Sequence, residues 1–293
     1  MNGDITRHLT CPICGDPLDP TPGALRCPAG HSFDLARQGY VNLGTGRVIH
    51  TGDTAEMIAA RDAFLQAGHF DPIGRALAEA AAPALVGEAP LIVDAGAGTG
   101  YHLGTVLDAA PGAVGLALDA AKPAVRRAAR AHPRAAAALA DTWSRLPVAD
   151  GAASVVLNVF APRNGAEFRR ILHREGVLLV VTPASDHLAE LVAALGLLQV
   201  APDKPGRVQA SLGGSFTLAR TDALRWPMQL SRAEIAALVE MGPSAWHRDP
   251  HAMETQIAAL PDPWTVTASV ELRRYPGEGP APQAAGPDPA TGC

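Results

Sequence analysis

Short apolar runs alternate with longer amphipathic segments through the middle of the chain. Such runs occupy residues 91–94, 113–119, 154–159 and 177–181, and polar, proline or glycine residues end or follow each within a few positions. Continuous short apolar runs are typical of parallel strands buried on both faces, and the segments between them are long enough for helices. The pattern therefore predicts an α/β fold built on a parallel sheet.

Further elements follow from helix-start signals and from alternation. A weaker strand, rich in alanine and leucine, is expected just before Asp141, and residues 264–275 alternate like a closing antiparallel strand. From about residue 200 the pattern is mixed. Helices are expected from Asp53 or Thr54 to residue 67, after Pro72, from about Tyr101, over 120–131, near His187, over 231–241 and after Trp246-His247.

Three alternate glycines follow the first apolar run, in the order Asp94-x-Gly96-x-Gly98-x-Gly100. Glycines let the backbone turn sharply and let a ligand approach main-chain N–H groups. A turn of this kind after a strand of an open α/β sheet is a common cofactor position, although a purely structural turn is the alternative. The order of acid and glycines resembles motif I of the class I S-adenosylmethionine (SAM) methyltransferases.

A second acid strengthens the prediction of a cofactor. The run 113–119 ends at Asp119, about twenty residues beyond the glycine turn, which is the separation expected of an acid that binds ribose hydroxyls. Two matched elements favour a SAM site over a structural turn.

Composition limits the class of protein. The chain has 293 residues, of which 47% are hydrophobic and 18% charged, so it can bury a sizeable core. It has no apolar run long enough for a membrane span, and we expect no membrane partner. The first residues lack the layout of a signal peptide, so a cytoplasmic location is expected. The net charge of −5 gives no general electrostatic attraction for nucleic acid, so an RNA site would be a local patch.

The N-terminal segment carries a metal-binding pattern. Cys11 and Cys14 form a C-x-x-C pair, and Cys27 and His31 form a C-x-x-x-H pair after a gap rich in proline and glycine. The gap suits a short hairpin, which can bring three thiolates and one imidazole into the tetrahedral arrangement of a structural zinc site. A disulfide or cysteines without a role are the alternatives. Cys293 stands alone in the tail.

The residues after this pattern make a more specific resemblance. The run C-P-x-C…C-x-x-x-H-x-F-D-x-A-x-x-G-Y-V-N-L resembles the RlmA family, zinc-containing guanine-N1 methyltransferases of 23S ribosomal RNA. Further matches include Gly68-His69-Phe70, Ala161-Pro162 and Met241-Gly242-Pro243. Residues 158–164 are similar to the actinomycete branch, which includes the tylosin-resistance methyltransferase. Motif I departs from the family pattern at residues 97, 99 and 102.

The resemblance implies a set of cofactor contacts and RNA-binding residues. RNA contacts are expected from the zinc module and from Arg26, Arg37, Arg47 and Arg61. For the two arginine-rich clusters, 126–134 and 163–174, a solvated helix face and an RNA site are the two alternatives. Phe70 is expected either to contact the cofactor or to be a core residue. Asp141 is expected either to bind the adenine or to cap a helix. His187 is expected near the cofactor, with a helix cap or a surface position as the alternatives. The expected SAM-binding residues are Phe70, Asp94, Gly96, Gly98, Gly100, Tyr101, Asp119, Asp141 and His187.

The chemistry leaves the catalytic group open. Guanine N1 carries a proton that has to leave before or during methylation. Asp53, His69 and Asn158 are candidates for handling that proton or orienting the base, and the sequence does not select among them.

The resemblance implies a function and a division of the chain. The implied function is transfer of a methyl group from SAM to guanine N1 in a 23S rRNA hairpin near the macrolide-binding exit tunnel. A homodimer is a further expectation for its assembly. Two alternatives are a SAM enzyme for a small molecule in a macrolide-type pathway and a non-catalytic zinc RNA-binding protein. The predicted division is a zinc module over 1–45, a helical linker over 46–88, a methyltransferase domain over 89–275 and a disordered tail over 276–293.

Overall fold

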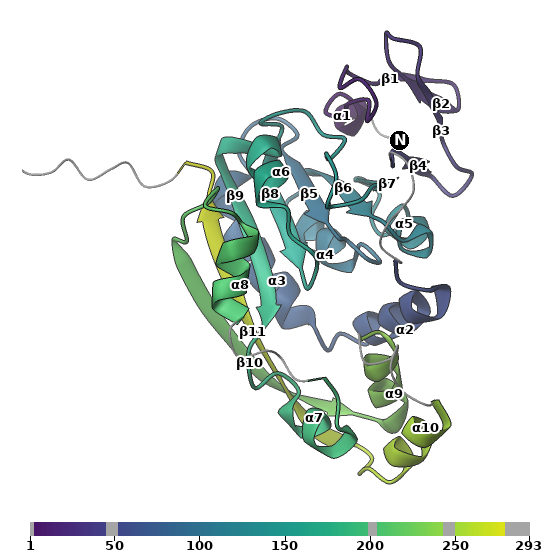
Figure 1. The fold of residues 1–293 in the computed structure, drawn as a ribbon, viewed down its shortest axis with the longest axis vertical. Coiled ribbons are helices and arrows are strands. Elements are labelled where there is room, and N and C mark those ends of the chain that lie inside the picture. Colours follow the sequence, from purple (N-terminus) through teal and green to yellow (C-terminus); the bar gives the residue numbers. More distant parts are fainter. Residues whose placement is uncertain (1–2, 45–51, 199–203, 243–249, 279–293) are drawn as a thin grey trace, which may run out of the picture.

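The computed structural model describes residues 3–44, 52–198, 204–242 and 250–278. In this part of the chain a large sheet of eight strands has the order β10-β11-β9-β8-β5-β6-β7-β4 (Figure 1). Its strands are β4 (Tyr40–Asn42), β5 (Leu91–Ala95), β6 (Val114–Asp119), β7 (Ala135–Leu139), β8 (Ala153–Val159), β9 (Leu172–Pro183), β10 (Arg220–Leu230) and β11 (Trp264–Pro276).

The strand directions identify the fold class. The strands from β4 to β9 pair in parallel, whereas β11 runs antiparallel to both β9 and β10. A parallel sheet with one antiparallel strand inserted near its end is the arrangement of class I SAM-dependent methyltransferases, so the predicted fold class is confirmed. The order reverses at β5, with β6 and β7 on one side and β8 and β9 on the other, and ligands of open α/β sheets bind at such a point.

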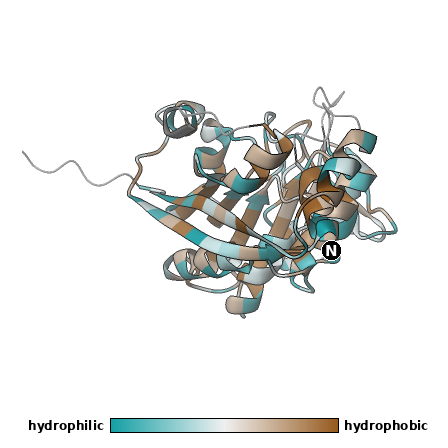
Figure 2. Cartoon of the chain, turned by 90° about the horizontal axis from the view of Figure 1, so that it is seen from below, coloured by the Kyte–Doolittle hydropathy of each residue, from teal (hydrophilic) through white to brown (hydrophobic). Residues whose placement is uncertain are grey.

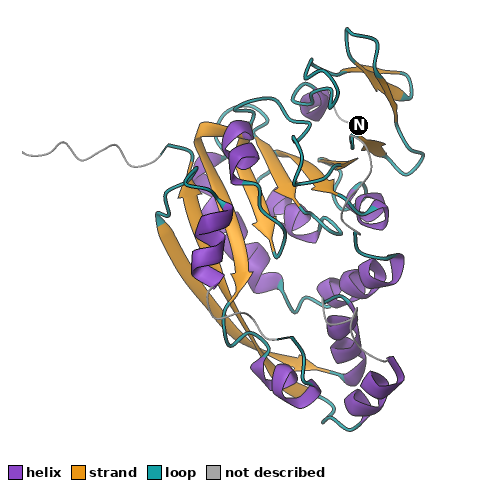
Figure 3. Ribbon diagram, viewed as in Figure 1, coloured by secondary structure: helices purple, strands orange, loops and turns teal. Residues whose placement is uncertain are grey.

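Helices cover both faces of this sheet (Figure 3). One face packs against α3, α4 and α5, and the other packs against α1, α6 and α8. The central strands, whose residues are largely hydrophobic in Figure 2, lie between these layers, and their buried apolar side chains form the core. The helices on the two faces are α1 (Gly3–Thr6), α3 (Asp71–Ala81), α4 (Tyr101–Ala109), α5 (Lys122–Ala128), α6 (Gly165–Ile171) and α8 (Lys204–Ser211), and the 3-10 helix Ala82–Ala84 follows α3.

The remaining helices lie around the far end of the β10–β11 hairpin (Figure 1). Helix α9 packs against α2 and α10, and α10 also contacts α7. Thr54 caps α2 by accepting a hydrogen bond from the N–H of Met57, which decides between the two predicted caps. These helices are α2 (Ala55–Gln66), α7 (Ala189–Leu195), α9 (Arg232–Glu240) and α10 (Pro250–Ala258).

The N-terminal segment forms a second, small antiparallel sheet of β1 (Asp19–Thr21), β2 (Ala24–Arg26) and β3 (Ser32–Asp34). The β1–β2 pair is the hairpin predicted from the gap between the two ligand pairs. Its apolar side chains belong to the same core cluster as those of β5 and β6. The segment continues into β4, which pairs with β7, so the predicted domain boundary at residue 45 falls just after a strand of the large sheet.

Some details differ from the pattern expected along the sequence. Gly176 lies inside β9, where a Cβ atom would be 2.7 Å from the carbonyl oxygen of Ser154. Helix α7 begins at Ala189, after Leu188 in the left-handed conformation with a φ of 56°. In the region of mixed pattern, β10 is a long edge strand whose burial alternates. Most of the predicted tail, residues 279–293, lies outside the described residues. No helix in the described ranges has the length and hydropathy needed to span a bilayer.

Candidate functional site

The first candidate site is the cluster of Cys11, Cys14, Cys27 and His31. Their four ligand atoms all lie within 4.8 Å of one another. Cys11 and Cys14 precede β1, whereas Cys27 and His31 lie between β2 and β3, so the β1–β2 hairpin brings the two pairs together. The structure thus places all four predicted ligands in one cluster.

The distances in this cluster fit a zinc ion. The Nδ1 atom of His31 is 3.5 Å from the Sγ atom of Cys11 and 3.3 Å from that of Cys27. The Sγ atoms of Cys14 and Cys27 are 3.6 Å apart. Zn–S bonds of about 2.3 Å and Zn–N bonds of about 2.0 Å give a tetrahedron with edges of roughly 3.5–3.8 Å. The three cysteines are free thiols, not disulfides, so the four side chains form a closed zinc site of the structural kind.

The second candidate site is the glycine turn between β5 and α4, where the strand order reverses. The N–H groups of Gly96 and Ala97 both donate to the carbonyl oxygen of Leu118, over 2.9 and 3.0 Å. The N–H of Gly98 donates to Oδ2 of Asp119 over 2.8 Å, and the N–H of Ala121 donates to Oδ1 of the same carboxylate over 2.8 Å. Asp119 therefore fixes the turns after β5 and β6 against each other.

The three glycines of the turn have different neighbours. A Cβ atom at Gly96 would lie 2.4 Å from the Cβ atom of Ala161, and one at Gly100 would lie 2.9 Å from another alanine Cβ. At Gly98 the nearest atoms belong to the side chain of Arg61, 3.5 and 3.6 Å away. Gly96 and Gly100 thus permit close packing, whereas Gly98 leaves space above the turn.

Two mostly buried carboxyl groups lie at this edge of the sheet. Asp94 is only 2% exposed. Its burial raises the pKa of the carboxyl to about 7, and the nearby charge of Asp119 adds to the shift. Burial also raises the pKa of Asp119, although the N–H groups of Ala121 and Gly98 act in the opposite direction.

Several buried polar atoms around the turn lack a partner among the described residues. They belong to the end of β5, the glycine turn, the first turn of α4 and the end of β8. Such atoms normally form hydrogen bonds, so their grouping fits a polar ligand at this site. The hydroxyl, amino and carboxylate groups of SAM match them in kind. The unpartnered atoms are Oδ1 of Asp94, Oγ1 of Thr99, Nδ1 of His102 and Oδ1 of Asn158.

Asp94 is expected to make folding stability depend on pH. Between the ordinary pKa of 3.8 and the raised value of about 7, the folded chain keeps a proton that the unfolded chain has lost. The free energy of unfolding should therefore fall as the pH rises through this window and level off above it. One pKa unit corresponds to about 1.4 kcal/mol, so the total is a few kcal/mol.

Asp94→Asn removes this titration. Urea unfolding at about pH 5.5 and about pH 7.5 should show the variant gaining stability relative to the wild type at the higher pH. A constant difference between the two proteins at both pH values would contradict a buried, protonated Asp94.

Aromatic side chains border the site beside the end of β8. The ring of Phe70 lies 6.1 Å from that of Phe160, 6.3 Å from His187 and 6.1 Å from Trp226, between centroids. Phe70 is 2% exposed, so it is a core residue as well as a neighbour of the site. The Nδ1 atom of His187 accepts a hydrogen bond of 3.1 Å from the N–H of Ser269. The structure thus brings Phe70 and His187 together, and their contact with the cofactor stays a prediction.

Tyr101 and Asp141, both predicted to bind the cofactor, also form hydrogen bonds within the protein. The hydroxyl of Tyr101, at the start of α4, donates to the carboxylate of Asp71 on α3. Asp141 lies two residues after β7, at the carboxyl edge of the sheet, and its Oδ1 atom accepts a hydrogen bond of 3.0 Å from the N–H of Trp143. A turn follows Asp141, so the alternative of a helix cap is wrong. The adenine contact stays a prediction.

Two candidates for proton handling are held in ion pairs. Asp53 pairs with Arg61, the side chain that lies over Gly98. The Nε2 atom of His69 is 2.8 Å from Oε1 of Glu234, and this contact is the main reason that the pKa of Glu234 falls to about 2. Their interactions with neighbouring side chains place Asp53 near the glycine turn and His69 against α9.

The third candidate, Asn158, is fully buried at the end of β8. Its Nδ2 atom donates to the carbonyl oxygens of Ala95 and Pro162, over 3.0 and 2.8 Å. These bonds tie the loop after β8 to the end of β5. The side chain therefore positions the loop that borders the glycine turn.

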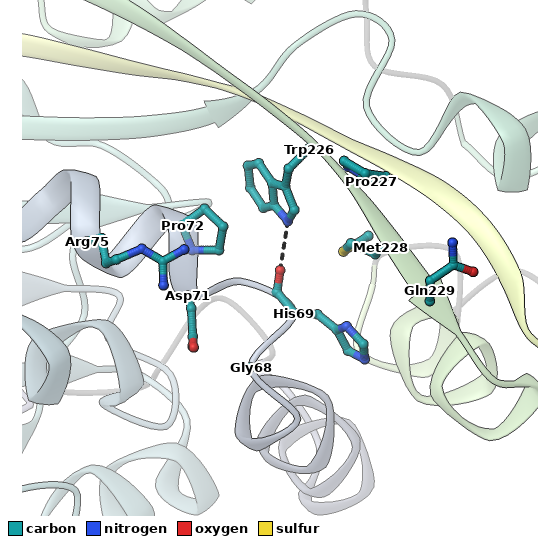
Figure 4. A pocket seen from close by; sticks show the side chains of 9 residues that line it. All are labelled: Gly68, His69, Asp71, Pro72, Arg75, Trp226, Pro227, Met228 and Gln229. Atoms are coloured by element: carbon teal, nitrogen blue, oxygen red, sulfur yellow. Dashed lines mark hydrogen bonds between the residues drawn. The ribbon is translucent and has the colours of Figure 1, made fainter.

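A pocket of about 390 Å³ lies between the start of α3 and β10 (Figure 4). The indole N–H of Trp226 donates to the carbonyl oxygen of His69 over 2.9 Å, and this bond joins its two walls. The glycine turn is not part of its lining, so the pocket adjoins the cofactor site without containing it. Its lining residues are Gly68, His69, Asp71, Pro72, Arg75, Trp226, Pro227, Met228 and Gln229.

Members of the two arginine clusters have internal partners. Arg134 donates to three carbonyl oxygens at the end of α4 and the following turn. Arg170 pairs with Glu167 and Asp150, and Arg127 pairs with Asp62. These interactions favour a structural role for the clusters over the RNA-binding alternative. Arg47, one of the expected RNA contacts, lies outside the described residues.

Comparisons with known proteins agree with this geometry. Residues 9–43 match the family model for the N-terminal zinc ribbon of RlmA. The chain is 60% identical over 292 residues to a Micromonospora griseorubida protein named for 23S rRNA (guanine-N1)-methyltransferase activity, covering 94% of this chain and 99% of that one. It is 51% identical over 271 residues to the 23S rRNA (guanine(748)-N(1))-methyltransferase of Streptomyces fradiae, covering 92% and 97%.

A solved structure from Bacillus halodurans, named as a methyltransferase, is 13% identical, covers 69% of this chain and 99% of its own, and has a TM-score of 0.49. The two high identities extend over nearly the full length of both sequences, and the zinc ribbon match covers all four ligands of the metal site. Together they confirm the predicted family, including its zinc and SAM cofactors. The chain belongs to the RlmA family of SAM-dependent 23S rRNA (guanine-N1)-methyltransferases.

Proposed function

We propose that this enzyme methylates N1 of the 23S rRNA guanine that corresponds to position 748, in a hairpin loop near the macrolide-binding exit tunnel. The observation that carries the proposal is the 51% identity to the Streptomyces fradiae enzyme, whose name specifies guanine 748. The methyl group contributes to resistance against tylosin-type macrolides, because it changes the shape and removes a hydrogen-bond donor in the wall of the drug site.

The residues of the glycine turn are proposed to hold the cofactor. SAM supplies a methyl group on a sulfonium, which leaves the protein mainly the task of positioning. Asp119 accepts the ribose hydroxyls on lone pairs that Gly98 and Ala121 do not use. Asp141 accepts from the adenine amino group at the next strand end, and Phe70 and His187 form the opposite wall.

The step exchanges the S–CH₃ bond for an N1–CH₃ bond, leaves the electron pair on sulfur and requires the N1 proton to leave. Asp53 and His69 already have charged or ionisable partners. Asn158 has a buried, unpartnered Oδ1 atom. Because an amide is a poor base, we assign Asn158 the role of orienting the loop and acceptor, and the proton acceptor is left among Asp53, His69 and water.

The N-terminal segment is proposed to grip the rRNA hairpin. RNA hairpins are recognised through shape, phosphates and splayed bases, which suits a compact module with Arg26 and Arg37 on its surface. The proposed division assigns residues 1–45 to this grip, 46–88 to the linker and 89–275 to catalysis. The cytoplasmic location of this enzyme and the homodimer stay predictions, and the molar mass in solution tests the homodimer.

Primer extension tests the product. N1 lies on the Watson–Crick edge, so its methylation stops reverse transcriptase. Ribosomal RNA from cells that express the enzyme should give a new stop at the guanine corresponding to 748, and rRNA from cells that express Gly98→Val should not. A stop at another nucleotide would identify a different target. Methyl transfer from labelled SAM only to small acceptors would favour the small-molecule alternative. Absence of any transfer would favour the non-catalytic alternative.

A further inference from the structure

Phe160 stands immediately after β8 with an unusual backbone conformation. Its φ is 53°, a left-handed value that it shares with Ala89 and Leu188 among the described non-glycine residues. For a bulky side chain this region is costly, by roughly 1–2 kcal/mol. Strained residues persist only where their surroundings impose the conformation, and they concentrate at functional sites.

The surroundings of Phe160 do impose it. Its own N–H donates to the carbonyl oxygen of Val181 in β9, over 3.1 Å. On either side of it, the Asn158 amide binds the carbonyl oxygens of Ala95 and Pro162. The next residue, Ala161, packs closely on Gly96. A Cβ atom added at Gly96 would lie only 2.4 Å from the Cβ atom of Ala161. The loop is thus fastened to the strands on both sides of β8, and the Phe160 ring is held in a fixed place.

Burial does not explain why a phenylalanine is held there. Phe160 is 42% exposed and belongs to the small group of large apolar residues of the described chain that are exposed. Its ring lies 6.1 Å from that of Phe70 and 6.0 Å from that of His187. Phe160 is therefore the solvent-facing end of an aromatic cluster whose other end, Phe70, is buried. An exposed aromatic ring at the carboxyl edge, beside the glycine turn, is placed to meet a second planar molecule.

We propose that Phe160 is the platform on which the acceptor guanine stacks after it has left the RNA stack. The inference rests on the proposed function and adds the residue that holds the base. A base has to be extruded before its N1 atom can be reached, and extruded bases in such enzymes stack on aromatic side chains. The anchored loop fixes the plane of the ring, so the guanine lies in a defined plane beside the methyl-donor site.

The test uses four variants of the full chain, an RNA hairpin that contains the target guanine, and binding of S-adenosylhomocysteine. Phe160→Ala should lower kcat/KM for the hairpin by about 10- to 100-fold, the usual effect of removing one base–aromatic stack. Phe160→Leu keeps apolar volume without a π face and should stay low, whereas Phe160→Tyr should restore activity to within about threefold. All these residues carry a Cβ atom, so they face the same backbone strain as the native one.

The affinity for S-adenosylhomocysteine distinguishes two roles of Phe160, stacking on the acceptor base and contacting the cofactor. Its Kd should change by less than about twofold in every Phe160 variant. Leu218→Ala, which truncates a residue of similar exposure, 43%, should leave both kcat/KM and Kd unchanged. A second readout is 2-aminopurine in place of the target guanine, which should be brighter in the complex with Phe160→Ala than in the wild-type complex.

Two results would overturn the inference. One is wild-type activity in Phe160→Leu, since that side chain cannot stack. The other is a rise in the Kd for S-adenosylhomocysteine equal to the loss in kcat/KM, which would place Phe160 against the cofactor. Failure of the wild-type enzyme to methylate the hairpin is a separate outcome, because it overturns the proposed function before any variant is compared.

Discussion

Cys27→Ser is expected to abolish zinc binding and to release the N-terminal segment from the large sheet. The three strands of this segment have three residues each, so they cannot form a stable sheet without further support. A structural zinc site contributes about 10–16 kcal/mol of apparent binding free energy in small zinc domains. Serine is a poor zinc ligand, and one lost thiolate leaves the tetrahedron open.

Metal analysis after gel filtration should find about one zinc per wild-type chain and less than about a tenth of that in Cys27→Ser. Hydrogen exchange should also become faster in Tyr40–Asn42 and in Ala135–Leu139, because β4 is the partner of β7. Cys293→Ser removes a cysteine that is not a predicted ligand and should keep its zinc. Full zinc retention by Cys27→Ser would disprove the assignment of the ligands.

The zinc ligands and the glycine turn could be predicted because their chemistry is local in sequence. Cys11 and Cys14 share one turn, Cys27 and His31 share another, and a short hairpin joins them. Asp94 and Asp119 end consecutive strands of a parallel sheet, so both had to reach the same edge. In these cases the strand and turn rules alone determine which side chains meet.

Strand β4 shows where such rules fail. Tyr40–Asn42 is too short to predict as a strand, and its register is set by pairing with Ala137 and its neighbours far along the chain. Strand β10 was missed for a related reason. Its alternation is visible only when the buried face is known. It also contains Pro227, and proline is rare in strands other than edge strands such as this one.

The contacts between distant segments at the site were equally hidden. His69 meets Glu234 across 165 positions of sequence, and Arg61 crosses above Gly98 because α2 packs against α9. Phe160 reads as the continuation of an apolar strand, and nothing in its neighbours specifies a φ of 53° or an exposed ring. Sequence patterns locate such residues, whereas packing decides what they face.

Gly98→Val is expected to weaken cofactor binding strongly while leaving the zinc site and the fold in place. Gly98 has a φ of +55°, and an added Cβ atom would meet only the side chain of Arg61, at 3.5 Å. The branched side chain would therefore enter the open space above the turn and not the core. Overpacking of this kind costs about 1–3 kcal/mol, so the Kd for S-adenosylhomocysteine should rise by about 10- to 100-fold or more.

Gly151→Val is the matched control. Gly151 also has a positive φ, +65°, and a Cβ atom there would meet nothing within 4 Å, so the variant carries a similar backbone strain away from the site. Both variants should lose a comparable amount of thermal stability, but only Gly98→Val should lose affinity in calorimetry. Equal Kd values for Gly98→Val and the wild type would mean that the cofactor does not approach the middle glycine. The space above the turn would then belong to Arg61 and Asp53, and the cofactor would have to bind at the β6 end of the site, around Asp119.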